Sequence, residues 1–368
     1  YFLGPKIANL VPGGATLPQF INIRYGRKAQ IVVSLVAIIY MSAFLVAEFA
    51  SINFLFPSIA EVSGLRIMIL VGAFTYAYLK KSGFKASYIT DKFQGIGIIL
   101  LLIVLFSIWF NQNSFTEIVN YSKLGGLGTF ETFSLKSALA VILAVTAAEI
   151  FSQGYWQRTF SAKNEKTIKK ASVISAIGAF LTILLIGVAG DVGAGKGLES
   201  PTLSFIGQLD LNLFSSVLLV SLCTLLVASS IDTLENAISS TISLDLIGKG
   251  AKEAQYITLA IIHFAIFAAI YVTNIFSVFL VADLLATCLV FPAFYKLKSK
   301  SKDHFLLFPF VFSLLSVFIY RYIFIDLTNN PGGIFIPTDL YGLADLNTFL
   351  VGFFTSIVLT FAYDKISK

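Results

Sequence analysis

One apolar stretch of the sequence carries oxygen-bearing side chains at a regular spacing. From Leu226 it reads LVASSIDTLENAISSTISLDLI. Its polar residues recur at three- and four-residue steps, which places them on one face of a helix. The members of this stripe are Ser229, Asp232 (or Thr233), Asn236, Ser240 and Ser243. Hydroxyl, carboxylate and carbonyl oxygens are the ligands that a hard cation accepts in exchange for water. The stripe therefore predicts an ion site.

A second interpretation of the stripe is structural. Small polar residues also hold neighbouring helices together through hydrogen bonds in a medium without water. The carboxylate of Asp232 favours the ion site, because contact between helices alone does not require a charge.

Few other ionisable residues lie inside apolar stretches. They are Glu48, Glu149, Glu235 and Asp283, with Asp91 at the start of an apolar segment. Such groups are costly in a membrane and usually face the interior of a helix bundle or a path for solutes. Glu149 lies in ALAVTAAEIFSQGYWQRTF, where it either contacts a solute or is held by a partner hydroxyl. Arg158 follows in the same stretch, at an expected membrane boundary.

The composition of the 368-residue chain defines its class. Hydrophobic residues make up 57% and charged residues only 12%, which is too little charge for a water-soluble surface. The composition predicts an integral membrane protein in contact with lipid and excludes a soluble enzyme. Neither a metal-ligand cluster nor a phosphate-binding loop occurs in the sequence, and no basic and aromatic face predicts binding to nucleic acid.

Ten segments are long and apolar enough to cross a bilayer core about 30 Å thick as helices. We expect them at 29–51, 64–80, 93–111, 136–157, 171–190, 212–246, 256–275, 278–295, 305–325 and 346–363. Together they predict an all-α, multi-pass transmembrane domain that covers residues 1–368.

Lysine and arginine are concentrated in alternate loops of this topology, as around Arg24, Lys80, Lys163 and Lys296. Because cytoplasmic loops of membrane proteins carry an excess of basic residues, both ends of the chain are expected in the cytoplasm and the protein in the cell membrane. The sequence begins with Tyr1, and residues 1–23 contain too many Pro and Gly residues to span a membrane. We therefore expect a further segment before Tyr1.

Four parts of the sequence together resemble the sodium:solute symporter family, which includes sodium-coupled carriers of sugars, proline, sialic acid and urea. They occur in the family's order and reach most of the chain up to about residue 300. They are YFLGP with ATLPQFINIRYGRK, then TYAYLKKSGFKASYITDKFQG, then SQGYWQRTFSAKN, and finally SSIDTLENAISSTISLDL.

The resemblance implies a leucine-transporter-like fold, a five-plus-five inverted repeat with broken helices at a solute site in mid-membrane. The ten segments then correspond to core helices three to ten and two C-terminal helices, and the first core helix and nearly all of the second are missing. The implied sodium site takes the carbonyl of Leu226 and the hydroxyls of Ser229 and Ser230.

The resemblance also implies further site residues. A possible second sodium site has Asp91, Asp232 and Thr233 as ligands. Glu149, Gln153 and Arg158 are candidates for solute binding or gating. Sodium is the coupling ion in this interpretation, and no cofactor is expected.

The expected function is secondary active transport: sodium-coupled symport of a small polar solute by alternating access. Three alternatives stay open, namely a membrane sensor or structural module that does not transport, a passive channel, and a proton-coupled carrier that uses Glu149 or Asp232. The solute and the oligomeric state are left open by the sequence.

Overall fold

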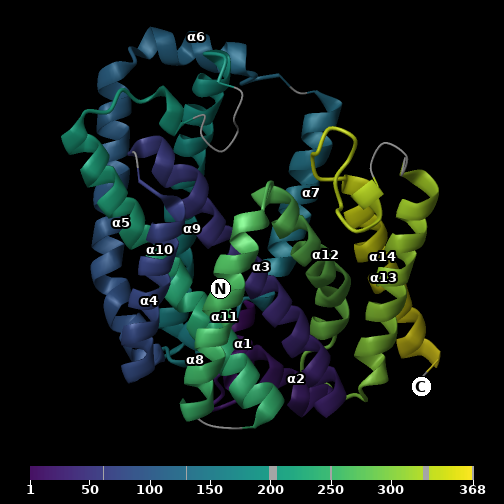
Figure 1. Cartoon of the computed structure of the whole chain (residues 1–368). Coiled ribbons are helices and arrows are strands. Elements are labelled where there is room, and N and C mark those ends of the chain that lie inside the picture. The colour runs from purple at the N-terminus through teal and green to yellow at the C-terminus, as the bar shows by residue number, and fades with distance from the viewer. Residues whose placement is uncertain (61, 130, 199–204, 249–250, 326–330, 367–368) are drawn as a thin grey trace.

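The described part of the chain is a bundle of long helices (Figure 1). The computed structural model describes residues 1–60, 62–129, 131–198, 205–248, 251–325 and 331–366. Within these ranges, nine helices are long and apolar enough to cross a membrane. Long apolar runs become helices there because a helix satisfies every backbone polar group within its own segment.

The first half of the chain contains eight described α-helices, both long and short. They are α1 (Leu3–Leu10), α2 (Leu17–Tyr25), α3 (Arg27–Ile59), α4 (Gly64–Ser82), α5 (Phe84–Gln112), α6 (Phe115–Gly125), α7 (Thr132–Ala148) and α8 (Gln153–Phe160). The second half consists of α9 (Glu165–Gly195), α10 (Leu213–Ser240), α11 (Ala251–Tyr271), α12 (Ile275–Phe294), α13 (His304–Phe324) and α14 (Leu346–Ile366).

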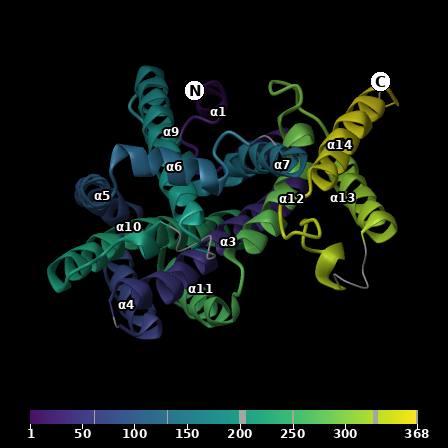
Figure 2. The ribbon, with the colours of Figure 1, turned by 90° about the horizontal axis from the view of Figure 1, so that it is seen from above.

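Helix α3 is the central element of the bundle. It packs against α10, α11 and α12, and Figure 2 shows it running obliquely between them, with α13 and α14 at one edge. Ala29, Ala37 and Ala50 of α3 are fully buried. Small side chains of this kind let helices approach closely in a membrane, where close packing is a main attraction between helices.

One end of the bundle joins loops that are distant in the sequence. The Arg24 side chain donates to the carbonyl oxygens of Ser299 and Ala293, each at 3.0 Å. Arg27 donates to the Asp245 carbonyl at 2.5 Å. Helix α2, the π-helix Thr241–Ile247 that continues α10, and the end of α12 with the segment after it therefore meet at one end.

The opposite end carries α6, which lies across the top of the bundle in Figure 1. There Lys196 donates to the Asn113 side chain at 2.5 Å, and Gln112 donates to the Asp210 carbonyl at 2.7 Å. Alternate loops thus lie at opposite ends, which is the arrangement that successive membrane crossings require.

The sequence predicts one continuous helix over 136–157, and that prediction is wrong. Helix α7 ends at Ala148, a short 3-10 turn follows at Glu149–Phe151, and α8 begins at Gln153. Side chains replace the missing backbone donors at the break. Trp156 Nε1 donates to the Ile150 carbonyl at 2.6 Å, and Gln153 Nε2 donates to the Phe151 carbonyl at 3.0 Å. A break inside a membrane is stable only with such replacements.

Other helix boundaries differ less. The expected segment 256–275 crosses the turn between α11 and α12, because α12 begins at Ile275 with Asn274 as its N-cap. The Asn274 side chain accepts a hydrogen bond from the Ser277 backbone at 3.2 Å, as an N-cap residue does. The segment 64–80 lies in α4, which is not among the nine apolar helices, and its Arg66 lies close to one end.

Candidate functional site

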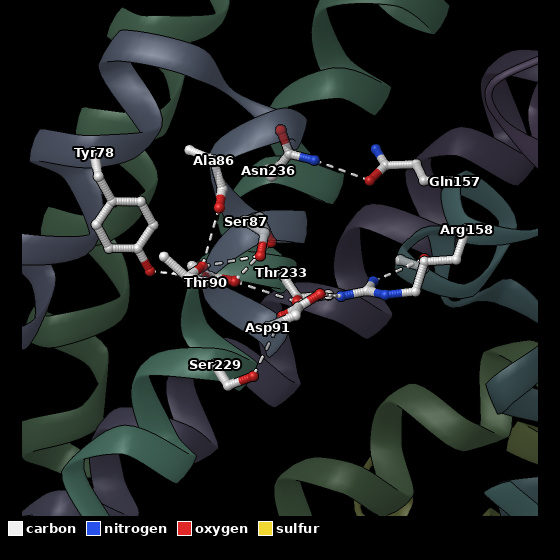
Figure 3. A network of polar contacts seen from close by, with 12 residues as sticks. Tyr78, Ala86, Ser87, Thr90, Asp91, Gln157, Arg158, Ser229, Thr233 and Asn236 are labelled. Carbon is white, nitrogen blue, oxygen red and sulfur yellow. Dashed lines mark hydrogen bonds and ion pairs between the residues drawn. The ribbon is translucent and has the colours of Figure 1, made fainter. Parts of the chain in front are cut away.

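Helices α5, α8 and α10 meet at a cluster of polar side chains (Figure 3). Their close approach depends on Gly154, near the start of α8. A Cβ atom at Gly154 would lie 2.8 Å from the Cγ2 atom of Thr233 on α10, closer than real contacts allow. Glycine therefore lets α8 lie directly against α10 and brings Arg158, one turn later, into the cluster.

Arg158 bridges these three helices. Its Nη2 atom lies 2.5 Å from Asp91 Oδ2 on α5 and 3.0 Å from Thr233 Oγ1 on α10, while Nη1 donates to the Gly154 carbonyl at 3.0 Å (Figure 3). The sequence places Arg158 at a membrane boundary or in a gate. In the structure its side chain is 35% exposed and turns into the bundle.

Asp232 on α10 is fully buried and faces α4 and α5. It accepts hydrogen bonds from the hydroxyls of Tyr78 at 2.5 Å, Ser87 at 2.8 Å and Thr90 at 3.1 Å. Three hydroxyl donors of this kind stabilise an ionised carboxylate, because hydrogen bonds to a charged group are stronger than those to a neutral one.

The residues of the possible second sodium site lie near one another. The Thr233 hydroxyl is 3.3 Å from Asp232 Oδ1, and both Thr233 and Asp91 contact Arg158. A guanidinium group therefore occupies the position between Asp91 and Thr233. Asp232 instead directs its oxygens to hydroxyl groups of α4 and α5.

The residues of the main predicted sodium site lie on one part of α10. Ser229 donates to Asp91 Oδ1 at 3.4 Å. Ser230 is hydrogen-bonded to Glu48 of α3. The two neighbouring hydroxyls therefore face different helices, α5 and α3. Leu226 lies one turn earlier, with its side chain 36% exposed.

Glu149 lies at the break between α7 and α8. Its carboxylate is hydrogen-bonded to the hydroxyls of Tyr40 on α3 and Tyr155 on α8. Asp283 on α12 is an electrostatic neighbour of Glu149 and is 1% exposed. Glu149 also lines a cavity of about 350 Å³ together with Tyr155 and Trp156.

Three amide side chains hold the break in place. Gln153 accepts a hydrogen bond from the backbone N–H of Leu17 at 2.9 Å, so it joins the break to α2. Asn236 of α10 donates to Gln157 of α8 at 2.9 Å (Figure 3). Gln153 thus has a positioning role in this structure and is fully buried.

Tyr40, Tyr78, Ser87 and Thr90 were not predicted from the sequence. A signal for two of them is present, because Ser87 lies three residues before Thr90 and four before Asp91, which are the spacings of neighbours on a helix surface. The two tyrosines have no such local signal, since only the packing of α3 and α4 brings them to the carboxylates.

Comparisons with known proteins lead to membrane transporters. No family model matches the chain. The chain is 27% identical over 303 residues to the spermidine transporter DUR31 of Candida albicans (strain SC5314 / ATCC MYA-2876), an alignment that covers 78% of the chain. The alignment covers 57% of that relative, so the chain spans little more than half of the relative's length.

A solved structure shows the same fold. It is the substrate-bound, outward-open state of a Na+-coupled sialic acid symporter, with a TM-score of 0.65 and 14% sequence identity. The match covers 95% of this chain and 77% of that one. The fold is therefore leucine-transporter-like, and the break at Glu149–Phe151 agrees with the discontinuous helices that many transporters have at mid-membrane.

Proposed function

We propose that the protein is a secondary active transporter that couples the entry of sodium to the uptake of a small polar solute by alternating access. The observation that carries this proposal is the position of Ser229 and Ser230 on α10. Their hydroxyls face two carboxylates, Asp91 on α5 and Glu48 on α3. These are the oxygen types that replace water around a hard cation.

In this proposal sodium binds at Ser229 and Ser230, with the carbonyl of Leu226 as a further ligand. Binding favours the outward-open state, and this coupling requires that sodium has different affinities for the two states. A membrane potential supplies about 2.3 kcal/mol per elementary charge per 100 mV, which supports a modest accumulation of solute.

Arg158 acts as a tethered cation at the possible second site. Its positive charge balances the negative charge of Asp91 while α5, α8 and α10 are held together, with Arg158 Nη2 2.5 Å from Asp91 Oδ2. A sodium ion that binds Asp91 and Thr233 has to displace the guanidinium, so occupancy of this site is linked to separation of α8 from α5. The pair is therefore a gate in the proposed cycle.

The solute class is suggested by the relative, which is a spermidine transporter. A polyamine is therefore the first solute to test. The proposed location is the cell membrane, with both ends of the chain in the cytoplasm. Basic residues such as Arg24, Arg27 and Lys28 gather at one end of the bundle, which supports this orientation.

The test is uptake of labelled spermidine by proteoliposomes with sodium or choline outside, at fixed pH. Sodium-dependent uptake in the wild type that is lost in Ser230→Ala supports the proposal. Ser221→Ala is the matched control, since Ser221 is exposed on the same helix and donates to the Val217 carbonyl of its own helix at 2.8 Å. Equal uptake in choline contradicts sodium coupling, and uptake driven by a pH gradient alone favours a proton-coupled carrier.

A further inference from the structure

Two carboxylates beside the break have no positive partner within the described residues. Glu149 follows the last residue of α7, and Asp283 lies on α12 next to it electrostatically. Neither of them forms an ion pair in the part of the chain that the structure describes. Charges at this depth in a membrane bundle normally pair with one another or with a ligand, because an unpaired charge is costly there.

Asp283 is 1% exposed. Its Oδ1 atom has no hydrogen-bond partner among the residues that the structure describes, not even a neutral donor. Glu149 is better satisfied, since it accepts from Tyr40 and Tyr155. A buried carboxylate oxygen without a donor favours an occupant that brings both a positive charge and N–H groups.

The backbone at the break adds to the negative potential. The C-terminal end of α7 lies at Ala148, and the last carbonyl groups of a helix carry a partial negative charge that stabilises cations. The carbonyls of Ile150 and Phe151 are already occupied by Trp156 and Gln153. The chain's own side chains therefore stabilise the break between α7 and α8, and no ligand is needed to form it.

The surroundings suit an organic cation better than a metal ion. No group of three or more His, Cys, Asp and Glu side chains that could hold a metal occurs among the residues that the structure describes. The cavity at Glu149 is about 350 Å³ and is partly lined by the rings of Tyr155 and Trp156, while Asp283 is not among its lining residues. Aromatic rings attract ammonium groups, and a cavity of this size admits an aliphatic chain.

We propose that Glu149 and Asp283 each bind one ammonium group of an aliphatic diamine, so that the solute site selects molecules with two positive charges. This inference rests on the proposed transport function and deepens it by naming the solute class and its two anchoring residues. Tyr40 positions Glu149 from α3, where its own side chain is 2% exposed.

The test is competition binding to the purified full chain, with 1,4-diaminobutane, n-butylamine and n-butanol as probes. We expect the wild type to prefer the diamine over the monoamine by about tenfold or more, the effect of one hydrogen bond to a charged group. Glu149→Gln and Asp283→Asn should each weaken diamine binding by a similar factor and leave monoamine binding nearly unchanged. The preference for two charges is then lost in either variant.

The matched control is Glu131→Gln, because Glu131 is exposed and makes no side-chain capping bond at the start of α7. It should bind like the wild type. Thermal unfolding of each variant checks the fold, and Asp283→Asn is expected to be no less stable, since Asp283 Oδ1 has no partner to lose. If one variant does not fold, the other tests the proposal alone, because each removes one charge.

Diamine binding that is equal in the wild type and both variants overturns the proposal, as does equal affinity for diamine and monoamine in the wild type. These outcomes are distinct from failure of the transport proposal. Sodium-dependent uptake of another solute, at the same rate in the wild type, Glu149→Gln and Asp283→Asn, would sustain symport and refute the diamine site. Selective diamine binding without sodium-dependent uptake would sustain the diamine site and refute sodium-coupled symport.

Discussion

Arg158 Nη2 lies 2.5 Å from Asp91 Oδ2, and this ion pair joins α8, the helix after the break, to α5. Both side chains keep some access to solvent, with exposures of 35% and 22%. The pair therefore contributes modestly to stability, as partly exposed ion pairs do. The pair joins α5 to α8, and Arg158 also contacts Thr233 of α10, so its main role in the proposed cycle is to hold these three helices together.

Exchange of either partner should impair transport. We expect Arg158→Gln and Asp91→Asn each to reduce uptake strongly, because each leaves a polar partner without its ion pair at the junction of three helices. A double-mutant cycle on thermal unfolding should give a coupling free energy of about 1 kcal/mol, after allowance for solvent screening. Additive effects of the two changes would show that the two side chains are not paired in the membrane.

The contact between α8 and α10 should tolerate no side chain at residue 154. Gly154→Ala places a Cβ atom 2.8 Å from Thr233 Cγ2, and overpacking of this kind costs about 1–3 kcal/mol. Thr233→Ser removes that methyl group and keeps the hydroxyl that Arg158 contacts at 3.0 Å. The double variant should therefore recover stability and uptake in thermal and transport assays. A double variant as unstable as Gly154→Ala would disprove the close approach of these helices.

The free energy of unfolding should fall in steps as the hydrogen bonds from hydroxyl groups to Asp232 are removed. Tyr78→Phe removes one donor and keeps the ring, so we expect a loss of about 1–3 kcal/mol in the free energy of unfolding. Asp232→Asn should cost more, because an amide has only one acceptor oxygen and its nitrogen opposes the hydroxyl donors. Chemical denaturation of the purified variants measures both effects. Equal stability of wild type and Asp232→Asn would contradict the observed hydrogen bonds at 2.5, 2.8 and 3.1 Å.

The break between α7 and α8 should depend on the indole N–H group of Trp156. Trp156→Phe keeps an aromatic ring and removes the donor to the Ile150 carbonyl, which is 2.6 Å away. A carbonyl left without a donor in a membrane interior should lower the free energy of unfolding by about 1–3 kcal/mol. Thermal unfolding checks this value. Trp109→Phe serves as a comparison outside the break, since its indole donates to Gln208 at 2.9 Å.

Much of the helical architecture could be predicted because it depends on local composition. Long apolar runs must form helices in a membrane, and the alternate basic loops indicate which loops share an end. The grouping of Asp91 with Asp232 and Thr233 came from a family resemblance. In the structure Thr233 lies 3.3 Å from Asp232, and Asp91 and Thr233 both contact Arg158.

Features that depend on contacts between distant helices could not be predicted. The break at Glu149–Phe151 contains neither Pro nor Gly, and its replacement donors become visible only when Trp156 folds back to Ile150. Arg158 was expected at a boundary because lysines follow it in the sequence, yet the close contact at Gly154 turns it inward.

The most direct test of the central claim is accumulation of labelled spermidine in proteoliposomes under an inward sodium gradient. The account predicts a transient internal concentration above the external one, which a sodium ionophore abolishes and Ser230→Ala prevents. A channel would only equalise the two concentrations, with or without the gradient. Accumulation that never exceeds equilibrium, or that survives collapse of the sodium gradient, would contradict sodium-coupled transport.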